Sequence, residues 1–190
     1  MKAVMISIQP KWVEKIANGE KTIEVRKTAP KEVPFKCYIY ETQGQYVKFT
    51  HGAHTKYGYG RGKVIGAFIC DRIEMVNAKC SDYGIDLFYH DCLTNGCLTE
   101  REIEKYFNIP EDRDLRAMKG NGYVWHISDL KIYDRPKELS EFYTKKKCNS
   151  CKKSGYESTA CMYDEDCKMP MSITRAPLSW QYIEDLGEEK

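Results

Sequence analysis

The stretch GEKTIEVRK, at residues 19–27, decides how the rest of this sequence is interpreted. Its second half alternates apolar with polar residues, a pattern that predicts a β-strand with two different faces. Thr22, Glu24 and Arg26 would share one face, with about 7 Å between successive members, and the apolar residues between them would take the other. Gly19 would end a preceding helix, because glycine readily adopts the left-handed conformation at a helix C-terminus.

The polar face of this strand is the first candidate site. A guanidinium is a rigid fork for phosphate or guanine, and a carboxylate accepts hydrogen bonds from exocyclic amines. Lys21, in the turn before the strand, adds a mobile cation. From spacing alone, the simpler interpretation is a solvated strand face on which Glu24 and Arg26 pair with each other.

The segments around this strand alternate between strand and helix signals. The apolar run at 3–8 predicts an inner strand, and Pro10 suits the first turn of a helix. Thr99 and Glu102 form a capping-box pattern that predicts a helix over 99–107. Further strands are expected at 37–42, 63–76 and 123–133, a helical turn or two at 136–142 and a long mobile loop at 43–62, while 77–96 has no clear assignment.

Length and composition indicate one core with an appendage. The chain has 190 residues and a formal net charge of +2, so binding to nucleic acid would need a local basic patch. The N-terminus lacks the pattern of a signal peptide, and no stretch approaches the roughly 20 apolar residues of a membrane span. We therefore expect a cytoplasmic protein, in which the nine cysteines stay reduced.

Three segments together resemble ASCH domains of the PUA-like superfamily. SIQPKWVEKI at 7–16 followed by GEKTIEVRK is similar to their opening, and GYVWHISDLKIY at 122–133 is similar to their closing strand. PLSWQYIED at 177–185 resembles the tail of bacterial and phage members that carry a cysteine cluster. The resemblance implies an α+β fold, a small mixed or antiparallel β-barrel with flanking helices. We expect an ASCH domain at 1–143, with a cysteine-rich knuckle at 144–190 packed on it.

The same resemblance implies a function, since the superfamily mostly handles RNA, modified bases or nucleotides. The first hypothesis is an RNA- or nucleotide-binding protein whose cleft is lined by Lys21, Thr22, Glu24 and Arg26. The alternative is a hydrolase of a modified nucleoside or RNA, with Lys21 and Glu24 as its acid–base pair. The amidohydrolase branch of the family looks to use a Lys-x-x-Thr pattern in which the threonine is the nucleophile. In this sequence Glu24 occupies the position of that threonine, and a carboxylate cannot replace the hydroxyl nucleophile, so the amidohydrolase interpretation is weakened. A third interpretation is an adaptor that binds a protein partner.

The segment 43–62 mixes basic and aromatic residues. His51 and Tyr57 are its candidate ligand-binding residues, near Tyr59, Lys56 and Arg61. Such a mixture suits single-stranded nucleic acid, because rings stack on bases while cations follow the phosphates. A glycine-rich surface loop without a ligand explains the same composition equally well.

Four cysteines near the C-terminus have metal-ligand spacing. A Cys-x-x-Cys pair lets two sulfurs reach one tetrahedral zinc from a tight turn, and two further thiolates close a structural site. A disulfide formed on oxidation, or thiols without a role, are the alternatives. The predicted zinc ligands are Cys148, Cys151, Cys161 and Cys167.

Two aromatic residues outside these motifs are assigned to structure rather than to ligand contact. His126 lies inside an expected strand, where a histidine is more often hydrogen-bonded than catalytic. Trp180 follows the cysteine cluster and is expected to pack the C-terminal segment against the domain.

Overall fold

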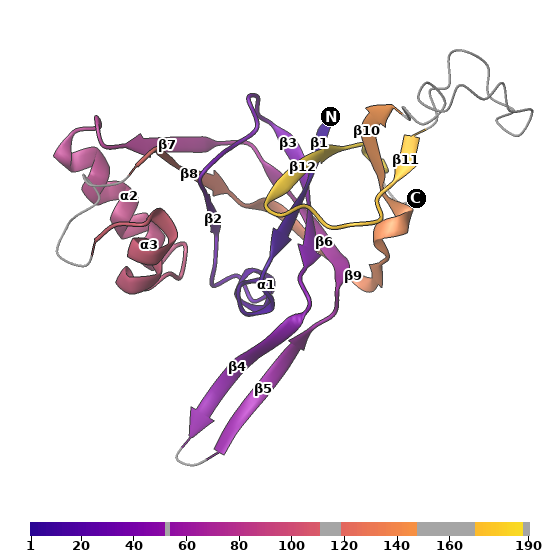
Figure 1. The fold of residues 1–190 in the computed structure, drawn as a ribbon, viewed down its shortest axis with the longest axis horizontal. Helices are drawn as coiled ribbons and strands as arrows, with labels where there is room; N and C mark the ends of the chain where they lie inside the picture. Colours follow the sequence, from indigo (N-terminus) through magenta and orange to yellow (C-terminus); the bar gives the residue numbers. More distant parts are fainter. Residues whose placement is uncertain (52–53, 111–118, 148–169, 188–190) are drawn as a thin grey trace, which may run out of the picture.

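A seven-stranded mixed sheet forms the centre of the computed structural model, which describes residues 1–51, 54–110, 119–147 and 170–187 (Figure 1). β1 pairs in parallel with β3, and the other neighbours in this sheet are antiparallel. The strand order is β11 (Pro170–Ser172), β10 (Tyr143–Lys147), β12 (Trp180–Ile183), β1 (Lys2–Ile8), β3 (Phe35–Glu41), β6 (Lys63–Cys70) and β9 (Ser128–Lys137).

A smaller three-stranded sheet continues from the large one. Its order is β2 (Ile23–Arg26), β8 (Asn121–His126) and β7 (Ile73–Asn77). The prediction of single long strands at 63–76 and 123–133 is therefore wrong, because each stretch is broken into two strands, one in each sheet. β6 pairs with β9 in the large sheet and β7 pairs with β8 in the small one. The apolar pattern runs through both breaks because one core, with Val4, Phe35 and Trp125, lies between the sheets.

Two helices were predicted from local signals and both are confirmed. α1 (Pro10–Ala17) starts at its proline, buries Val13 and Ile16, and ends before Gly19, whose φ is +75°. α3 (Glu100–Phe107) begins with the expected capping box of Thr99 and Glu102. The expected turn within 136–142 is the 3₁₀ helix η2 (Leu139–Glu141).

The segment that had no assignment contains α2 (Asp82–Thr94). This helix buries Ile85, Phe88 and Cys92, which pack with α3 and with the small sheet in a second apolar cluster. α2 and α3 together lie at one end of the molecule, beside β7 and β8 (Figure 1). The α+β class with a mixed sheet and flanking helices is confirmed.

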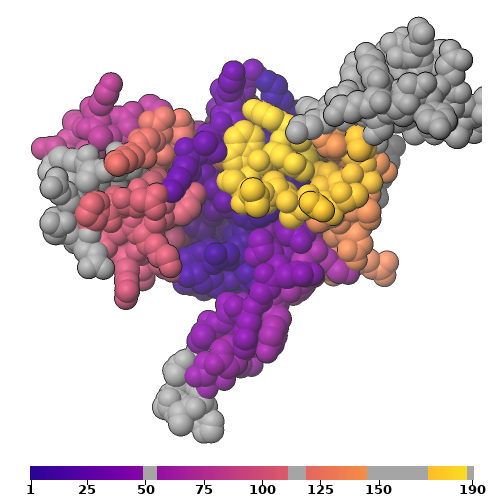
Figure 2. Space-filling view, in the orientation of Figure 1, coloured from indigo at the N-terminus to yellow at the C-terminus, as the bar shows by residue number. Residues whose placement is uncertain are grey.

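The prediction of a long mobile loop at 43–62 is wrong. This segment forms an antiparallel hairpin of β4 (Gly44–His51) and β5 (His54–Gly60), which projects from the body of the molecule (Figures 1 and 2). Its glycines and polar residues resemble loop composition because most of the ribbon faces solvent and buries little apolar surface.

Strands from the C-terminal segment belong to the large sheet. β12 lies between β1 and β10, and its Ile183 packs with Ala3 and Phe142 in a third apolar cluster. Trp180 packs edge-to-face on Trp125, with ring centroids 5.7 Å apart, so the packing role expected for it is confirmed. The boundary between residues 143 and 144 remains a prediction. None of the described helices is long and apolar enough to cross a membrane.

Candidate ligand-binding pocket

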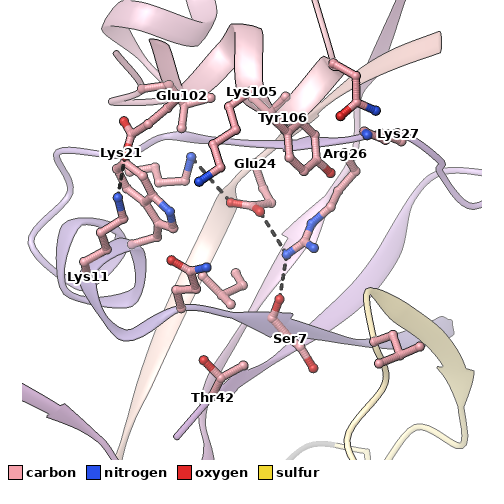
Figure 3. Close-up of a pocket in the computed structure, with 17 residues that line it drawn as sticks. Ser7, Lys11, Lys21, Glu24, Arg26, Lys27, Thr42, Glu102, Lys105 and Tyr106 are labelled. Atoms are coloured by element: carbon pink, nitrogen blue, oxygen red, sulfur yellow. Dashed lines mark hydrogen bonds and ion pairs between the residues drawn. The ribbon is translucent and has the colours of Figure 1, made fainter. Parts of the chain in front are cut away.

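A cavity of about 690 Å³ lies between α1, β2, α3 and the C-terminal segment before β12 (Figure 3). β2 contributes its polar face, α1 its N-terminal turn, and α3 the side chains that point back toward β2. The lining residues with charged or aromatic side chains are Lys11, Trp12, Lys21, Glu24, Arg26, Lys27, Glu102, Lys105 and Tyr106. This wall therefore carries five cations against two carboxylates, a much stronger local positive charge than the chain as a whole.

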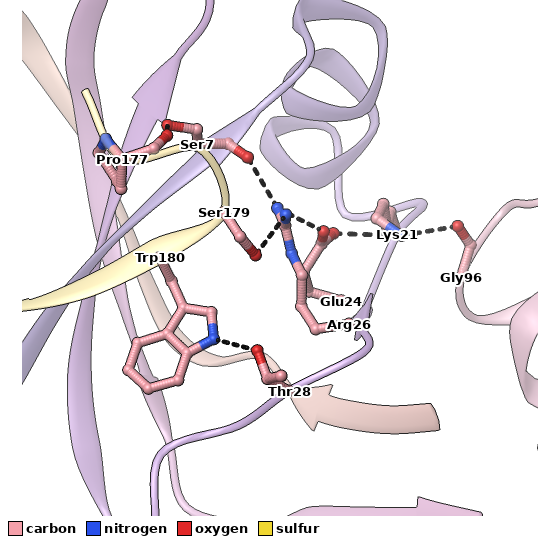
Figure 4. A network of polar contacts seen from close by, with 9 residues as sticks. All are labelled: Ser7, Lys21, Glu24, Arg26, Thr28, Gly96, Pro177, Ser179 and Trp180. Carbon is pink, nitrogen blue, oxygen red and sulfur yellow. Dashed lines mark hydrogen bonds and ion pairs between the residues drawn. The ribbon is translucent and has the colours of Figure 1, made fainter. Parts of the chain in front are cut away.

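Glu24 is the centre of a buried ionic network on the pocket floor (Figure 4). Its Oε1 lies 3.0 Å from Arg26 Nη2, and its Oε2 lies 3.4 Å from Lys21 Nζ. Lys21 and Glu24 are only 3% and 6% exposed. Lys21 Nζ also donates a 2.8 Å hydrogen bond to the carbonyl of Gly96. Charges this well shielded interact strongly because little water screens them.

Arg26 is held in place by the backbone of β1 and by the segment 177–179 before β12, called the tail below. Its Nη2 donates to the carbonyl of Ser7 at 2.7 Å, and its Nη1 lies 3.5 Å from Ser179 Oγ (Figure 4). Ser7 in turn binds the tail, since its Oγ donates to the carbonyl of Pro177 at 2.6 Å and its amide donates to that of Ser179 at 2.9 Å. The tail thus forms one wall of the pocket, and Trp180 Nε1 donates to Thr28 Oγ1 beside it at 3.0 Å.

Two buried polar atoms of this network have no hydrogen-bond partner within the described residues. They are Glu24 Oε2, an acceptor, and Arg26 Nε, a donor. The Lys21 ammonium is within ion-pair distance of Glu24 Oε2, but it is oriented toward Gly96 and gives no hydrogen bond to the carboxylate. Buried polar groups are rarely left without a partner. Neither atom is accessible to solvent, so a ligand that offers both a donor and an acceptor would satisfy them once neighbouring side chains move aside.

The mouth of the pocket carries a second set of charges. Lys11 pairs with Glu102, and although burial raises the pKa of Glu102, the hydrogen bonds from Lys11 and Thr99 outweigh it and lower that pKa. Lys27 lies over the ring of Tyr106, 5.1 Å from its centroid, and burial raises the pKa of that phenol. Neither Lys27 nor Lys105 forms an ion pair with any residue of the described part of the chain, so both are open to an anion.

Of the predicted ligand-binding residues, Lys21, Glu24 and Arg26 come together in the pocket. Thr22 does not line it: β2 begins one residue later, and the exposed Thr22 uses its amide to bind the carbonyl of Asn95. Tyr57 lies on β5, away from the pocket. His51 is the last residue of β4, and its side chain is outside the described part.

The structural role expected for His126 agrees with its contacts. Its Nε2 lies 2.9 Å from Glu74 Oε1, and its Nδ1 lies 3.2 Å from Arg72 Nη2. The four predicted zinc ligands, in contrast, are outside the described residues. Among the residues that are described, no group of three or more potential ligands could hold a metal ion.

Four further residues have no individual signal in the sequence: three of them line the pocket, and Ser179 contacts Arg26 beside it. Ser7 and Ser179 meet Arg26 through sheet pairing between segments far apart in the chain, and Lys105 and Tyr106 come from α3. The helical spacing of α3 was recognisable, and it separates Ile103 and Phe107, which are buried, from the residues that face the cavity. For α3, the sequence predicted the helix but not its position opposite β2.

Comparison with solved structures identifies the fold. The ASCH protein from Zymomonas mobilis superposes with a TM-score of 0.54 at 17% identity, over 96% of this chain and 88% of that one. A tyrosine-to-phenylalanine mutant of the same protein gives a TM-score of 0.53 at 15% identity, over 97% of this chain and 91% of the other. The chain has the ASCH fold. The sequence itself matches no protein-family model and no curated protein.

Within this ASCH fold, the decisive segment 19–27 forms one side of the pocket, opposite α3. The strand that carries Glu24 and Arg26 pairs with β8, so Glu24 lies directly across from Trp125 and Arg26 across from Tyr123. Trp125 is completely buried in the main core. The polar floor of the pocket is thereby attached to a fully buried part of the main core.

Proposed function

We propose that this pocket binds RNA or a nucleotide. The observation that carries the proposal is the pair of buried atoms without hydrogen-bond partners, Glu24 Oε2 and Arg26 Nε, at the floor of a cationic cavity. Every nucleobase has an edge on which a donor and an acceptor are adjacent, and a carboxylate with a guanidinium complements such an edge. A simple anion would satisfy Arg26 and be repelled by Glu24.

The mouth of the pocket supports the same ligand class. Lys27 and Lys105 are exposed cations beside Tyr106, at the opening above the Glu24–Arg26 floor (Figure 3). A base inserted toward Glu24 would leave its phosphate near these two ammonium groups. The ring of Tyr106 and that of Trp12 line the same cavity and offer apolar surface to the sugar or base.

Binding of nucleotides and of short RNA oligonucleotides, measured by fluorescence anisotropy at several salt concentrations, tests this function. Lys105→Ala should weaken binding of all sequences and reduce the slope of log K against log salt by about 0.7, the value for one phosphate contact on a single strand. Lys79→Ala, at an exposed position before α2, is the matched control and should change neither. A wild-type protein that binds no nucleotide or RNA at low salt would refute the proposal.

The hydrolase alternative rests on the Lys21–Glu24 pair, with Nζ and Oε2 3.4 Å apart. As an acid–base pair, these groups would act on a modified nucleoside or RNA held in the same cavity. Glu24→Gln separates the two functions: an enzyme should keep its affinity and lose turnover, whereas a binding module should lose affinity or selectivity. Mass spectrometry of the incubated ligand detects any product.

A further inference from the structure

The projecting β4–β5 hairpin has two unlike faces. Residues directly opposite each other on an antiparallel pair share a face, and Val47 pairs with Tyr57 while Tyr46 pairs with Gly58. The face with Tyr46 is turned toward α1, where its phenol donates a 2.8 Å hydrogen bond to Glu14. A Cβ on Gly58 would lie 2.5 Å from the Tyr46 ring, so this face is closely packed.

The other face is apolar and exposed. Val47, Tyr57 and Tyr59 are 54%, 48% and 70% exposed, and they lie next to one another because Tyr57 is opposite Val47 and Tyr59 is two residues further along β5. Two-stranded hairpins are marginally stable by themselves. Here the hairpin is supported by the packing of its Tyr46 face against α1 and by its base, so the rings of Tyr57 and Tyr59 on the opposite face remain exposed to solvent.

The charge of this segment indicates which partner would cover that face. Between Glu41 and Asp71 the sequence has no acidic residue, although the chain contains 28 in total. The same stretch has four basic residues, and the acids that pair with Lys48 and Lys63 come from α1 and from the residue before η2. Such exposed pairs are weak and exchange readily for other anions. Aromatic rings on a ribbon without acids suit a polyanion with stackable bases better than a protein surface.

The hairpin also adjoins the pocket. Its base is wedged against α1: a Cβ on Gly60 would lie 2.5 Å from Pro10 Cγ and 1.8 Å from the carbonyl of Thr42. Thr42 itself lines the pocket, as do Lys11 and Trp12 in the first turn of α1. The pocket and the base of the hairpin therefore meet at Thr42 and the first turn of α1, so a ligand longer than one nucleotide that leaves the cavity there would lie beside the hairpin.

We infer that the exposed face of the β4–β5 hairpin is a second subsite, on which bases flanking the nucleotide in the pocket stack on Tyr57 and Tyr59. The inference rests on the proposed function and narrows its ligand to a single-stranded RNA of several nucleotides rather than a free nucleotide. Same-face residues two apart on a strand are separated by about 7 Å, and an extended single strand can present successive bases at such a spacing.

The test compares a mononucleotide with a single-stranded 12-nucleotide RNA, each binding to the full chain in anisotropy titrations. The double variant Tyr57→Ala/Tyr59→Ala should weaken RNA binding by about 25-fold or more, since each stacked ring contributes about 5- to 150-fold. Mononucleotide affinity should stay unchanged. Tyr57→Phe/Tyr59→Phe should retain RNA affinity, because stacking needs only the ring. Tyr83→Ala, at a tyrosine 77% exposed on α2, is the matched control.

A second substitution guards against a hairpin that simply unfolds. Tyr57→Leu/Tyr59→Leu keeps apolar side chains in the strand and removes the rings, so it should weaken RNA binding as the alanine pair does. Unchanged RNA affinity in both double variants would overturn the inference. So would a wild-type protein that binds RNA no more tightly than the mononucleotide, an outcome that leaves the proposed function standing. If the substitutions instead abolish self-association of the chain, the face is an interface between copies; absence of all binding refutes both proposals.

Discussion

Lys21 and Glu24 form an ion pair at the pocket floor, with Nζ and Oε2 3.4 Å apart and both side chains shielded from solvent. The pair connects two parts of the domain, because Lys21 also holds the carbonyl of Gly96 in the turn between α2 and α3. Glu24, on the other side, orients Arg26. The pocket floor is thus part of the structural core as well as the candidate recognition surface.

Removing one member of this pair should therefore be costly. Lys21→Met leaves Glu24 buried with only Arg26 as a partner, and loss of one partner of a buried pair typically costs roughly 3–5 kcal/mol of unfolding free energy. The exposed pair Lys15–Glu20, at 3.0 Å, is the control, and Lys15→Met should cost less than about 1 kcal/mol. Urea denaturation measures both. Similar losses in the two variants would contradict the buried role of Lys21.

Helix capping offers a test of how α3 supports the pocket. Thr99 Oγ1 accepts a hydrogen bond from the amide of Glu102, and Ser81 Oγ accepts one from the amide of Gly84 at the start of α2. Thr99→Ala and Ser81→Ala should each lower the unfolding free energy by about 1 kcal/mol. Only Thr99→Ala should also weaken nucleotide binding, because α3 carries Lys105 and Tyr106 into the cavity. Equal ligand affinity in both variants would show that α3 does not contribute to ligand binding.

The parts of this fold that sequence reasoning predicted are those with local signals. Pro10 and Gly19 bound α1, the capping box at Thr99 begins α3, and alternation marks the strand that carries Glu24. Each of these signals depends on residues that are close together in the sequence. They pointed to Lys21, Glu24 and Arg26, which the structure brings together at one cavity.

The features that were missed depend on distant contacts. Ser179 meets Arg26 across 153 residues of sequence, and no short-range pattern reveals such a pairing. The breaks between β6 and β7 and between β8 and β9 occur where the amide of His126 binds the carbonyl of Arg72, inside apolar runs that look continuous. Thr22 was assigned to the polar face by alternation alone, but the strand begins only at Ile23.

The pH dependence of stability should depend in part on Asp185. Burial alone would raise the pKa of this carboxyl, but hydrogen bonds from Tyr38 at 2.7 Å and from the amide of Gly187, together with Lys36, lower it below the ordinary value of 3.8. A lowered folded-state pKa stabilises the protein fully above the unfolded value and loses that contribution as pH falls through the folded value. The difference in unfolding free energy between wild type and Asp185→Asn should be constant from pH 5 to 7 and shrink below about pH 4.

Tyr38→Phe is the matched variant for this effect, since it keeps the ring and removes the hydrogen bond to Asp185. Its difference from wild type should shrink over the same acidic range. Parallel stability curves for wild type and Asp185→Asn down to pH 2.5 would show that the carboxyl has no such shift. Denaturant titrations at each pH supply the free energies.

Thiol labelling separates the buried cysteines from the predicted zinc ligands. Burial raises the pKa of Cys70 and of Cys92 to about 12, and burial also raises the pKa of Cys37 well above its ordinary value, so few of these thiols ionise at pH 8. All three should resist iodoacetamide in the native protein, because the thiolate is the reactive form. The cysteines of the 148–167 cluster should resist it only while zinc is bound, and should be modified after chelation; native mass spectrometry should show one zinc ion lost in parallel. Peptide mapping that finds the cluster modified equally with and without chelator would refute the zinc site, and modification of Cys37 at the same rate would refute its burial.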